Sequence, residues 1–159
     1  MRTPFAILPI AIAALALAAS PARAVDAIVP FTGLVTSTCV LTVGTPGVLA
    51  AGAGLDTLSS SAAGGIPGTV TALTTGSNFR ISTIAPSNFS IAPPGGGDGV
   101  NFSASYRATG ATSIGDTLGL NETRLGLGVS ILTVNLAAQK SGGAFPGGAY
   151  AAEVVVRCE

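Results

Sequence analysis

The two cysteines of this 159-residue chain, Cys39 and Cys158, constrain its fold more than any other residues. Each lies in a stretch whose apolar side chains recur at every second position, residues 31–43 and residues 150–158. A period of two is typical of a β-strand with one buried face. Both cysteines fall on the apolar face, so the sequence predicts a first and a last strand that each direct a cysteine toward the core.

A leader peptide is expected before these strands. The N-terminus has one early positive charge at Arg2, a short apolar run over residues 5–19 and a small-x-small ending, Ala22-Arg23-Ala24. These are the three parts of a secretory signal peptide. The alternative, a transmembrane anchor, needs about 20 apolar residues, more than this run contains. We therefore predict a signal peptide over residues 1–24 and a single exported domain over residues 25–159.

Export makes a disulfide the simplest use of two cysteines, because the periplasm and the cell exterior permit thiol oxidation. A bridge between Cys39 and Cys158 would close a loop of nearly the whole mature domain. For a loop of about 100 residues, the chain-entropy model gives up to roughly 4.7 kcal/mol of stabilisation. The alternative use, zinc binding by the two thiols, lacks further ligands because the chain has no histidine and no CxxC pair.

Short alternating stretches separated by glycine and proline recur through the mature chain. No window shows a sustained 3.6-residue period, so we expect little or no helix. About seven strands in such a length predict an all-β, antiparallel β-sandwich. The expected strands between the first and the last cover residues 69–75, 78–84, 87–92, 100–109, 118–120 and 125–138.

Two further expectations concern the connections. Residues 50–68 are rich in glycine, alanine and serine, and they predict a long excursion with one short edge strand. Residues 139–148 contain turn chemistry, Gly-Gly and Pro-Gly-Gly, directly before the last strand. The strands over residues 125–138 and 150–158 are therefore expected to be antiparallel neighbours.

The charge of the chain excludes some classes of partner. After cleavage, five basic residues remain against seven acidic ones, a net charge of −2. These charges are scattered and form no basic face to hold phosphates, so we predict no nucleic-acid partner. No later apolar run is long enough to span a bilayer, so we predict no membrane insertion of the mature chain.

The sequence offers few residues that could carry out catalysis. Hydrolases with a nucleophile–histidine pair are excluded because there is no histidine. The seven carboxylates lie mostly beside glycines or in turns, where such residues bend or cap the chain. We therefore prefer a structural role in turns to a role as the catalytic pair of a glycoside hydrolase. Gly95-Gly-Gly-Asp-Gly99 is a single copy of a calcium-type pattern and is better explained as a loop. We predict no enzyme, no catalytic residue, no cofactor and no metal site.

Two segments together resemble a known family. Val35-Thr-Ser-Thr-Cys39-Val-Leu-Thr-Val and Phe145-Pro-Gly-Gly-Ala-Tyr150-Ala-Ala-Glu-Val-Val-Val are similar to the first and last strands of bacterial pilin-like β-sandwiches. These are the fimbrial subunits of the chaperone–usher type and the related spore-coat-U-type proteins. The resemblance implies an Ig/pilin-like sandwich in the periplasm or on the bacterial cell surface.

The chain also departs from this family. A polymerising pilin resembles a sandwich that lacks one strand, with an extended N-terminal segment that inserts into its neighbour. If the first strand begins at residue 31, only residues 25–30 precede it, which is short for such a segment. Family members commonly pair the first-strand cysteine with one in the next strand, whereas here the partner is Cys158.

The leading hypothesis is an exported, non-enzymatic structural or surface-associated protein of a fimbrium that acts by strand-edge assembly or adhesion. Its partners would be like subunits or a periplasmic chaperone, and its mechanism β-strand addition. The alternative is a self-complete secreted module that binds a glycan or protein ligand through the loops at residues 50–68 and 93–99. The residues expected to matter are the bridge, Cys39 and Cys158, with Val35, Leu41, Tyr150, Val154 and Val156 around it.

Overall fold

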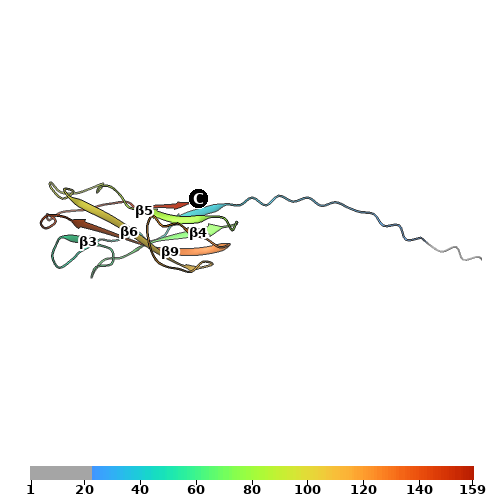
Figure 1. Ribbon diagram of the computed structural model, residues 1–159, viewed down its shortest axis with the longest axis horizontal. Coiled ribbons are helices and arrows are strands. Elements are labelled where there is room, and N and C mark those ends of the chain that lie inside the picture. The colour runs from blue at the N-terminus through green and yellow to red at the C-terminus, as the bar shows by residue number, and fades with distance from the viewer. Residues whose placement is uncertain (1–22) are drawn as a thin grey trace, which may run out of the picture. The chain divides into compact units, whose positions relative to one another are not determined.

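The described residues fold into β-structure (Figure 1). The computed structural model describes residues 23–159, and this range contains ten strands and no helix. The all-β, antiparallel prediction is confirmed. The strands are β1 (Cys39–Val43), β2 (Ala50–Ala51), β3 (Thr57–Ser59), β4 (Gly68–Thr74), β5 (Arg80–Ile84), β6 (Val100–Gly110), β7 (Ile114–Leu118), β8 (Thr123–Arg124), β9 (Gly128–Lys140) and β10 (Val155–Cys158).

The chain divides into two units between Gly33 and Leu34. The described part of the first unit, residues 23–33, contains no strand or helix, and every strand belongs to the second. Most of the expected leader peptide lies in residues 1–22, outside the described residues, so its cleavage after Ala24 stays a prediction. Residues 23–159 contain no helix that is long and apolar enough to cross a membrane.

The longest strand, β9, is the centre of a seven-stranded sheet. β6 pairs with it antiparallel along one edge, from Val100 opposite Lys140 to Gly110 opposite Ser130. The other edge of β9 is shared, because β4 pairs with its first half and β3 with its last residues. The sheet is completed by β1 beside β4, β2 beside β3 and β7 beside β6. Alternate side chains of β9 are buried: Ser130, Leu132, Val134, Leu136 and Ala138.

A three-stranded sheet, in the order β10–β5–β8, forms the second layer. Ile81 on β5 joins Tyr106 and Leu132 of the large sheet in one core cluster, and all three are fully buried. The Tyr106 hydroxyl oxygen lies 2.6 Å from the Asn121 carbonyl oxygen, 3.0 Å from that of Ile81 and 2.9 Å from Thr123 Oγ1. The two layers are therefore joined by apolar packing and by one buried tyrosine.

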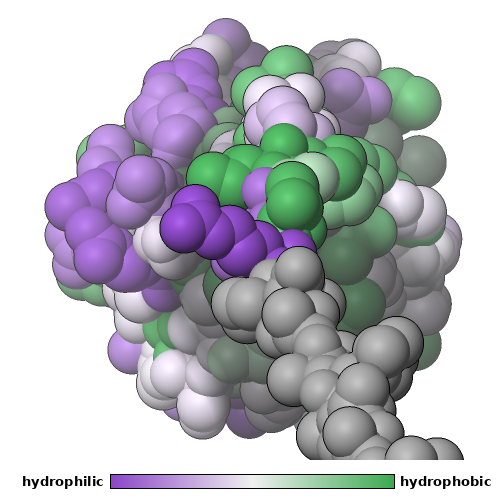
Figure 2. Space-filling view, turned by 90° about the vertical axis from the view of Figure 1, so that its right-hand side faces the viewer, coloured by the Kyte–Doolittle hydropathy of each residue, from purple (hydrophilic) through white to green (hydrophobic). Residues whose placement is uncertain are grey.

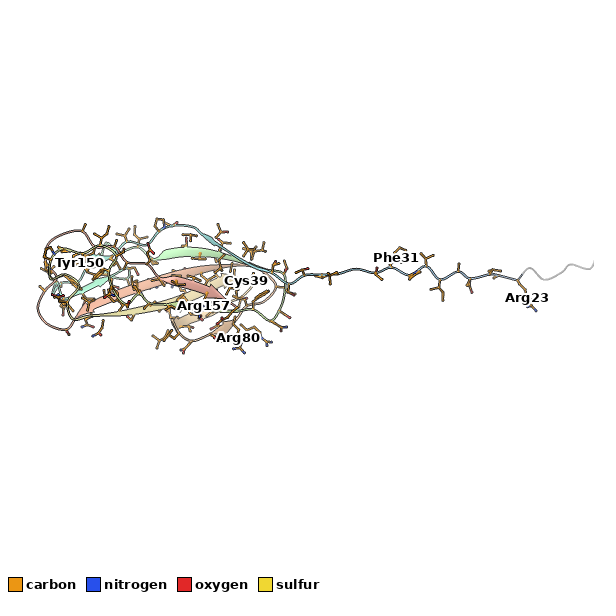
Figure 3. The ribbon with its side chains drawn as sticks, turned by 90° about the horizontal axis from the view of Figure 1, so that it is seen from above. Arg23, Phe31, Cys39, Arg80, Tyr150 and Arg157 are labelled. Atoms are coloured by element: carbon orange, nitrogen blue, oxygen red, sulfur yellow. A yellow bond between two sulfur atoms is a disulfide. The ribbon has the colours of Figure 1, made fainter. Side chains whose placement is uncertain are left out.

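The predicted disulfide is present between Cys39 and Cys158, whose Cα atoms are 6.5 Å apart. It joins β1 at the edge of the large sheet to β10 at the edge of the small one. Figure 3 shows Cys39 at one end of the sandwich and Tyr150 at the opposite end. We call these the disulfide end and the Tyr150 end.

The first strand is shorter than the sequence predicts. Regular pairing begins at Cys39, opposite Thr74, and not at residue 31. The reason is that β4 ends at Thr74, so residues 31–38 have no strand to pair with beyond contacts to Thr75. A period of two reports which side chains share a face and does not report whether a neighbouring strand exists.

The last strand has a different neighbour from the one expected. β10 pairs with β5, with Val155 opposite Ile84 and Cys158 opposite Ile81, and does not pair with β9. The connection over residues 141–154 carries the chain from the large sheet to the small one. Turn chemistry predicts that the chain reverses, but in a sandwich the next strand can lie in either layer.

Four other expectations need correction. Residues 87–92 contain a single bridge, Ile91 with Ala151, and no strand. The excursion over residues 50–68 contains two short strands, β2 and β3, where one was expected. The brief strand expected at residues 118–120 is β7, which ends at Leu118. Residues 78–84 do form a strand, β5, but it lies in the small sheet and pairs with β10 and β8, not with its sequence neighbour β4.

Candidate assembly groove

Two unpaired strand edges face each other at one side of the sandwich. Among residues 23–159, β1 pairs only with β4 and β10 only with β5, so each has one free edge. The disulfide joins the first residue of β1 to the last residue of β10, so the two strands run in opposite directions. A free edge presents N–H and C=O groups that another strand can pair with.

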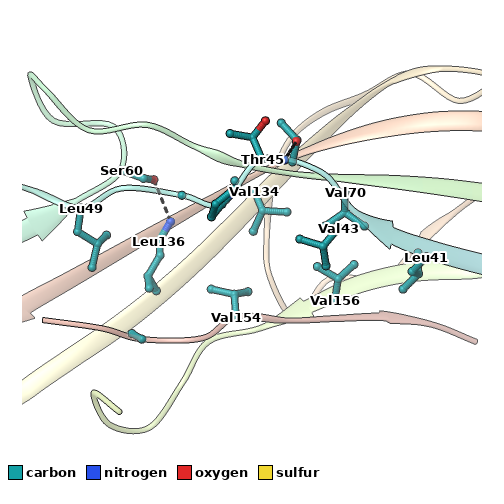
Figure 4. Close-up of a pocket in the computed structure, with 15 residues that line it drawn as sticks. Leu41, Val43, Thr45, Leu49, Ser60, Val70, Val134, Leu136, Val154 and Val156 are labelled. Atoms are coloured by element: carbon teal, nitrogen blue, oxygen red, sulfur yellow. Dashed lines mark hydrogen bonds between the residues drawn. The ribbon is translucent and has the colours of Figure 1, made fainter. Parts of the chain in front are cut away.

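Between these edges lies an apolar cavity of about 270 Å³. Its lining includes Leu41, Val43, Val134 and Leu136 from the large sheet, and Val154 and Val156 lie across from them (Figure 4). The residues that complete the lining are Thr45, Pro46, Gly47, Leu49, Ser60, Gly68, Thr69, Val70 and Ala152.

A second, larger cavity of about 650 Å³ continues the first toward the Tyr150 end. The two cavities share Gly47, Leu49 and Ala152. The walls of the second include Leu55, Leu58, Phe145 and Tyr150. Beside it, Phe145, Tyr150, Phe89 and Phe102 pack edge to face, with neighbouring ring centroids 4.8–6.0 Å apart. We call the two cavities together the groove.

The groove is lined almost entirely by uncharged side chains. Tyr150 is the one lining residue with a titratable group, and its hydroxyl donates a hydrogen bond to the Pro146 carbonyl oxygen at 2.7 Å. The buried hydroxyl of Ser60 already accepts a hydrogen bond from Leu136 N at 3.1 Å and donates one to Asn135 Oδ1 at 3.0 Å. The Thr69 hydroxyl accepts one from Thr45 N at 2.7 Å. The groove can therefore bind apolar side chains along an added backbone.

The described residues before β1 carry exposed apolar side chains, which are complementary to the apolar lining of the groove. Residues 25–35 form no strand, and the side chains of Phe31, Leu34 and Val35 are 92%, 92% and 86% exposed. Large apolar side chains are rarely left this exposed unless they meet a partner. Every odd position of this segment is apolar or glycine: Val25, Ala27, Val29, Phe31, Gly33 and Val35. We call residues 25–35 the donor segment.

Most of the residues chosen from the sequence meet at this groove. Leu41, Val154 and Val156 line its first cavity beside the bridge of Cys39 and Cys158, and Tyr150 lines its second. Val35 lies before β1, in the donor segment, and does not join them.

The sequence interpretation missed the rear of the groove and the donor segment. Val134 and Leu136 belong to the alternating stretch of β9, which predicts a buried face but not an unoccupied space above it. The donor segment was missed because its alternation continues without a break into β1.

The loops of the alternative hypothesis do not form a shared site. Ala51, Leu55 and Leu58 from residues 50–68 line the second cavity, but no residue of 93–99 does. The carbonyl oxygens of Gly95 and Asp98 accept hydrogen bonds from Lys140 Nζ at 2.6 and 2.9 Å. An ammonium group of the chain itself thus occupies the loop that resembles a calcium-binding pattern.

The charged residues of the described range form no other centre. No cluster of three or more metal-binding side chains occurs within residues 23–159. Arg80 Nη1 and Glu122 Oε2 are 3.8 Å apart, and both side chains are about half exposed. Figure 2 views the disulfide end, where strongly polar and apolar side chains occupy separate parts of the surface.

Comparisons with protein-family models, with curated proteins and with solved structures find no match for this chain.

Proposed function

We propose that the protein is an exported, non-enzymatic, pilin-like structural subunit that assembles by β-strand addition. The donor segment of one copy would fill the groove of the next copy and pair with the free edges of β1 and β10. The observation that carries this proposal is the combination of an apolar groove between two free edges with an exposed, alternating apolar segment in the same chain.

The donor segment is long enough to follow the groove. Eleven residues in strand conformation span about 36 Å, at roughly 3.3 Å per residue. The wall of the groove from Cys158 back to Tyr150 covers eight residue steps, about 26 Å on the same scale. The donor segment is thus long enough to follow the whole groove with its odd-numbered side chains directed inward.

The direction of insertion follows from where the donor segment leaves its own copy. It joins β1 at the disulfide end. If successive copies have the same orientation, the Val35 end of the segment lies at the Tyr150 end of the acceptor. The inserted strand would then run parallel to β1 and antiparallel to β10. A head-to-tail contact of this kind repeats without closing and gives a filament.

This proposal includes a partner before assembly. A subunit whose groove is empty exposes an apolar surface and two free edges, which favours aggregation. A periplasmic chaperone that covers the groove until a donor segment replaces it would prevent this. As part of the same proposal, the assembled protein would lie at the bacterial cell surface and contribute to adhesion.

The decisive experiment compares two matched variants of the mature chain, Phe31→Arg and Thr32→Arg. Both side chains lie in the donor segment, but only Phe31 is on the face that would enter the groove. Chains 25–159 are exported to a bacterial periplasm and examined by native mass spectrometry and negative-stain electron microscopy. We expect the wild type and Thr32→Arg to form ladders of subunits and Phe31→Arg to remain monomeric.

The opposite result supports the alternative hypothesis. If the wild type is a monomer, and deletion of residues 25–35 leaves its melting temperature unchanged, then the sandwich is self-complete. The second cavity, with Phe145 and Tyr150 in its wall, would then be the place to test for a glycan or protein ligand.

A further inference from the structure

The three residues that join the donor segment to β1 are held against the turn after β4. Thr38 N donates a hydrogen bond to Thr75 Oγ1 at 2.8 Å, and Thr75 N donates one to Thr38 O at 2.9 Å. Thr75 Oγ1 also lies 3.2 Å from the carbonyl oxygen of Thr36, to which it can donate. Because Cys39 pairs with Thr74, these contacts extend the β1–β4 ladder by one residue pair.

Gly76 completes this arrangement. It is buried, and a Cβ atom placed on it would lie 2.6 Å from both Cβ and Oγ of Ser37 and 3.3 Å from a ring carbon of Phe79. A side chain at this position would therefore displace Ser37. We call Thr36, Ser37, Thr38, Thr75 and Gly76 the exit clasp.

The donor segment cannot reach its own groove in the direction proposed for assembly. Val35 would have to lie near Ala152, while Cys39 is bonded to Cys158. Four residue steps from Val35 to Cys39 span at most about 14 Å. The six steps from Cys158 back to Ala152 span about 20 Å in extended conformation.

The opposite direction would require the chain to reverse within residues 36–38. The donor segment would then return along the free edge of β1, on the side away from β4. Such a turn would break the hydrogen bonds of Thr36 and Thr38 to Thr75 and lift Ser37 from Gly76. The exit clasp holds residues 36–38 in the direction of β1 and so opposes this turn.

We infer that the exit clasp prevents the donor segment from entering the groove of its own chain. The segment can then insert only into a second copy of the chain. This inference rests on the proposed function and adds to it the reason why copies join and do not close on themselves.

The test compares a clasp variant with a matched control. The clasp variant is Thr75→Val with Gly76→Val, which removes the hydroxyl and displaces Ser37. The control is Thr71→Val with Gly115→Val, because Thr71 lies within β4, away from the clasp, and a Cβ on Gly115 meets nothing within 4 Å. Native mass spectrometry of periplasmic chains 25–159 gives the fraction in oligomers, and a fluorescent peptide of residues 25–35 reports whether monomers have an open groove.

We expect the clasp variant to lose at least nine-tenths of the oligomer and to yield monomers that do not bind the peptide, because their own segment fills the groove. The control should assemble like the wild type. Oligomers of the clasp variant at the wild-type level, or clasp-variant monomers that bind the peptide as readily as the domain 36–159, would overturn the inference.

A second variant leaves every clasp residue in place. A twelve-residue Gly/Ser linker between Val35 and Thr36 has a mean span of about 20 Å, enough for the donor segment to enter its own groove. We expect this variant to be monomeric and closed to the peptide, and wild-type assembly would contradict the inference. Failure of the peptide to bind the domain 36–159 would instead overturn the proposed function itself, and the inference with it.

Discussion

Removal of the Cys39–Cys158 bridge should destabilise the domain strongly, because the bridge joins two strands that no hydrogen-bond ladder connects. β1 and β10 lie in different sheets, and the disulfide joins them at one end. In the unfolded chain the same bridge closes a loop of 119 residues. Loss of the bridge therefore raises the conformational entropy of the unfolded chain. It also removes the covalent link between the two strands that border the groove.

The size of the effect follows from the loop length. For about 119 residues the chain-entropy relation gives roughly 5 kcal/mol at 25 °C as an upper value. We expect a loss of about 3–5 kcal/mol in the free energy of unfolding. For a domain of this size that corresponds to a melting temperature lower by roughly 10–20 °C.

The assay is urea unfolding of monomeric chain 25–159, oxidised and after reduction, beside the double variant Cys39→Ser with Cys158→Ser. The reduced wild type and the double variant should unfold at similar, lower urea concentrations. The double variant is its own control, since reductant should leave its curve unchanged. Unfolding free energies of oxidised and fully reduced wild type that agree within about 1 kcal/mol would refute the argument.

Two further predictions concern the core. Tyr106→Phe should lower the free energy of unfolding by about 1–3 kcal/mol, because the hydroxyl of this fully buried side chain lies within hydrogen-bonding distance of the carbonyl oxygens of Ile81 and Asn121 and would be lost; an unchanged urea midpoint would contradict this. Leu132→Ala should cost about 2–5 kcal/mol, because the side chain is fully buried and leaves a cavity. Its neighbour Ile131 is half exposed, so Ile131→Ala should cost clearly less in the same urea titration, and equal costs would show that the two faces of β9 are assigned incorrectly.

Strands with a buried face were placed well by the sequence. β4, β6 and β9 were each expected within three residues of their observed bounds. In such strands the period of two arises from burial itself, so it is visible without knowledge of any partner. The same holds for the placement of Cys39 and Cys158 on inward faces.

The errors have a common cause, which is that pairing is a long-range property. Residues 31–38 alternate as well as β1 does, yet β4 ends at Thr74 and leaves them without a neighbour. β10 follows β9 in the chain and pairs with β5, because its apolar face completes the second layer. Local pattern sets which face of a strand is apolar, and packing of the layers sets which strand lies beside it.

By itself, the sequence determined the fold class, the antiparallel β-structure and the only pair of cysteines able to form a bridge, because these depend on residue type and on a local period. Only the tertiary structure decided that β1 and β10 leave two edges free, that an apolar groove lies between them and that Thr75 and Gly76 hold the exit of the donor segment. These features join residues from distant parts of the chain. The physical reason is that an unpaired edge is defined by the neighbour that a strand lacks, which its own sequence does not record.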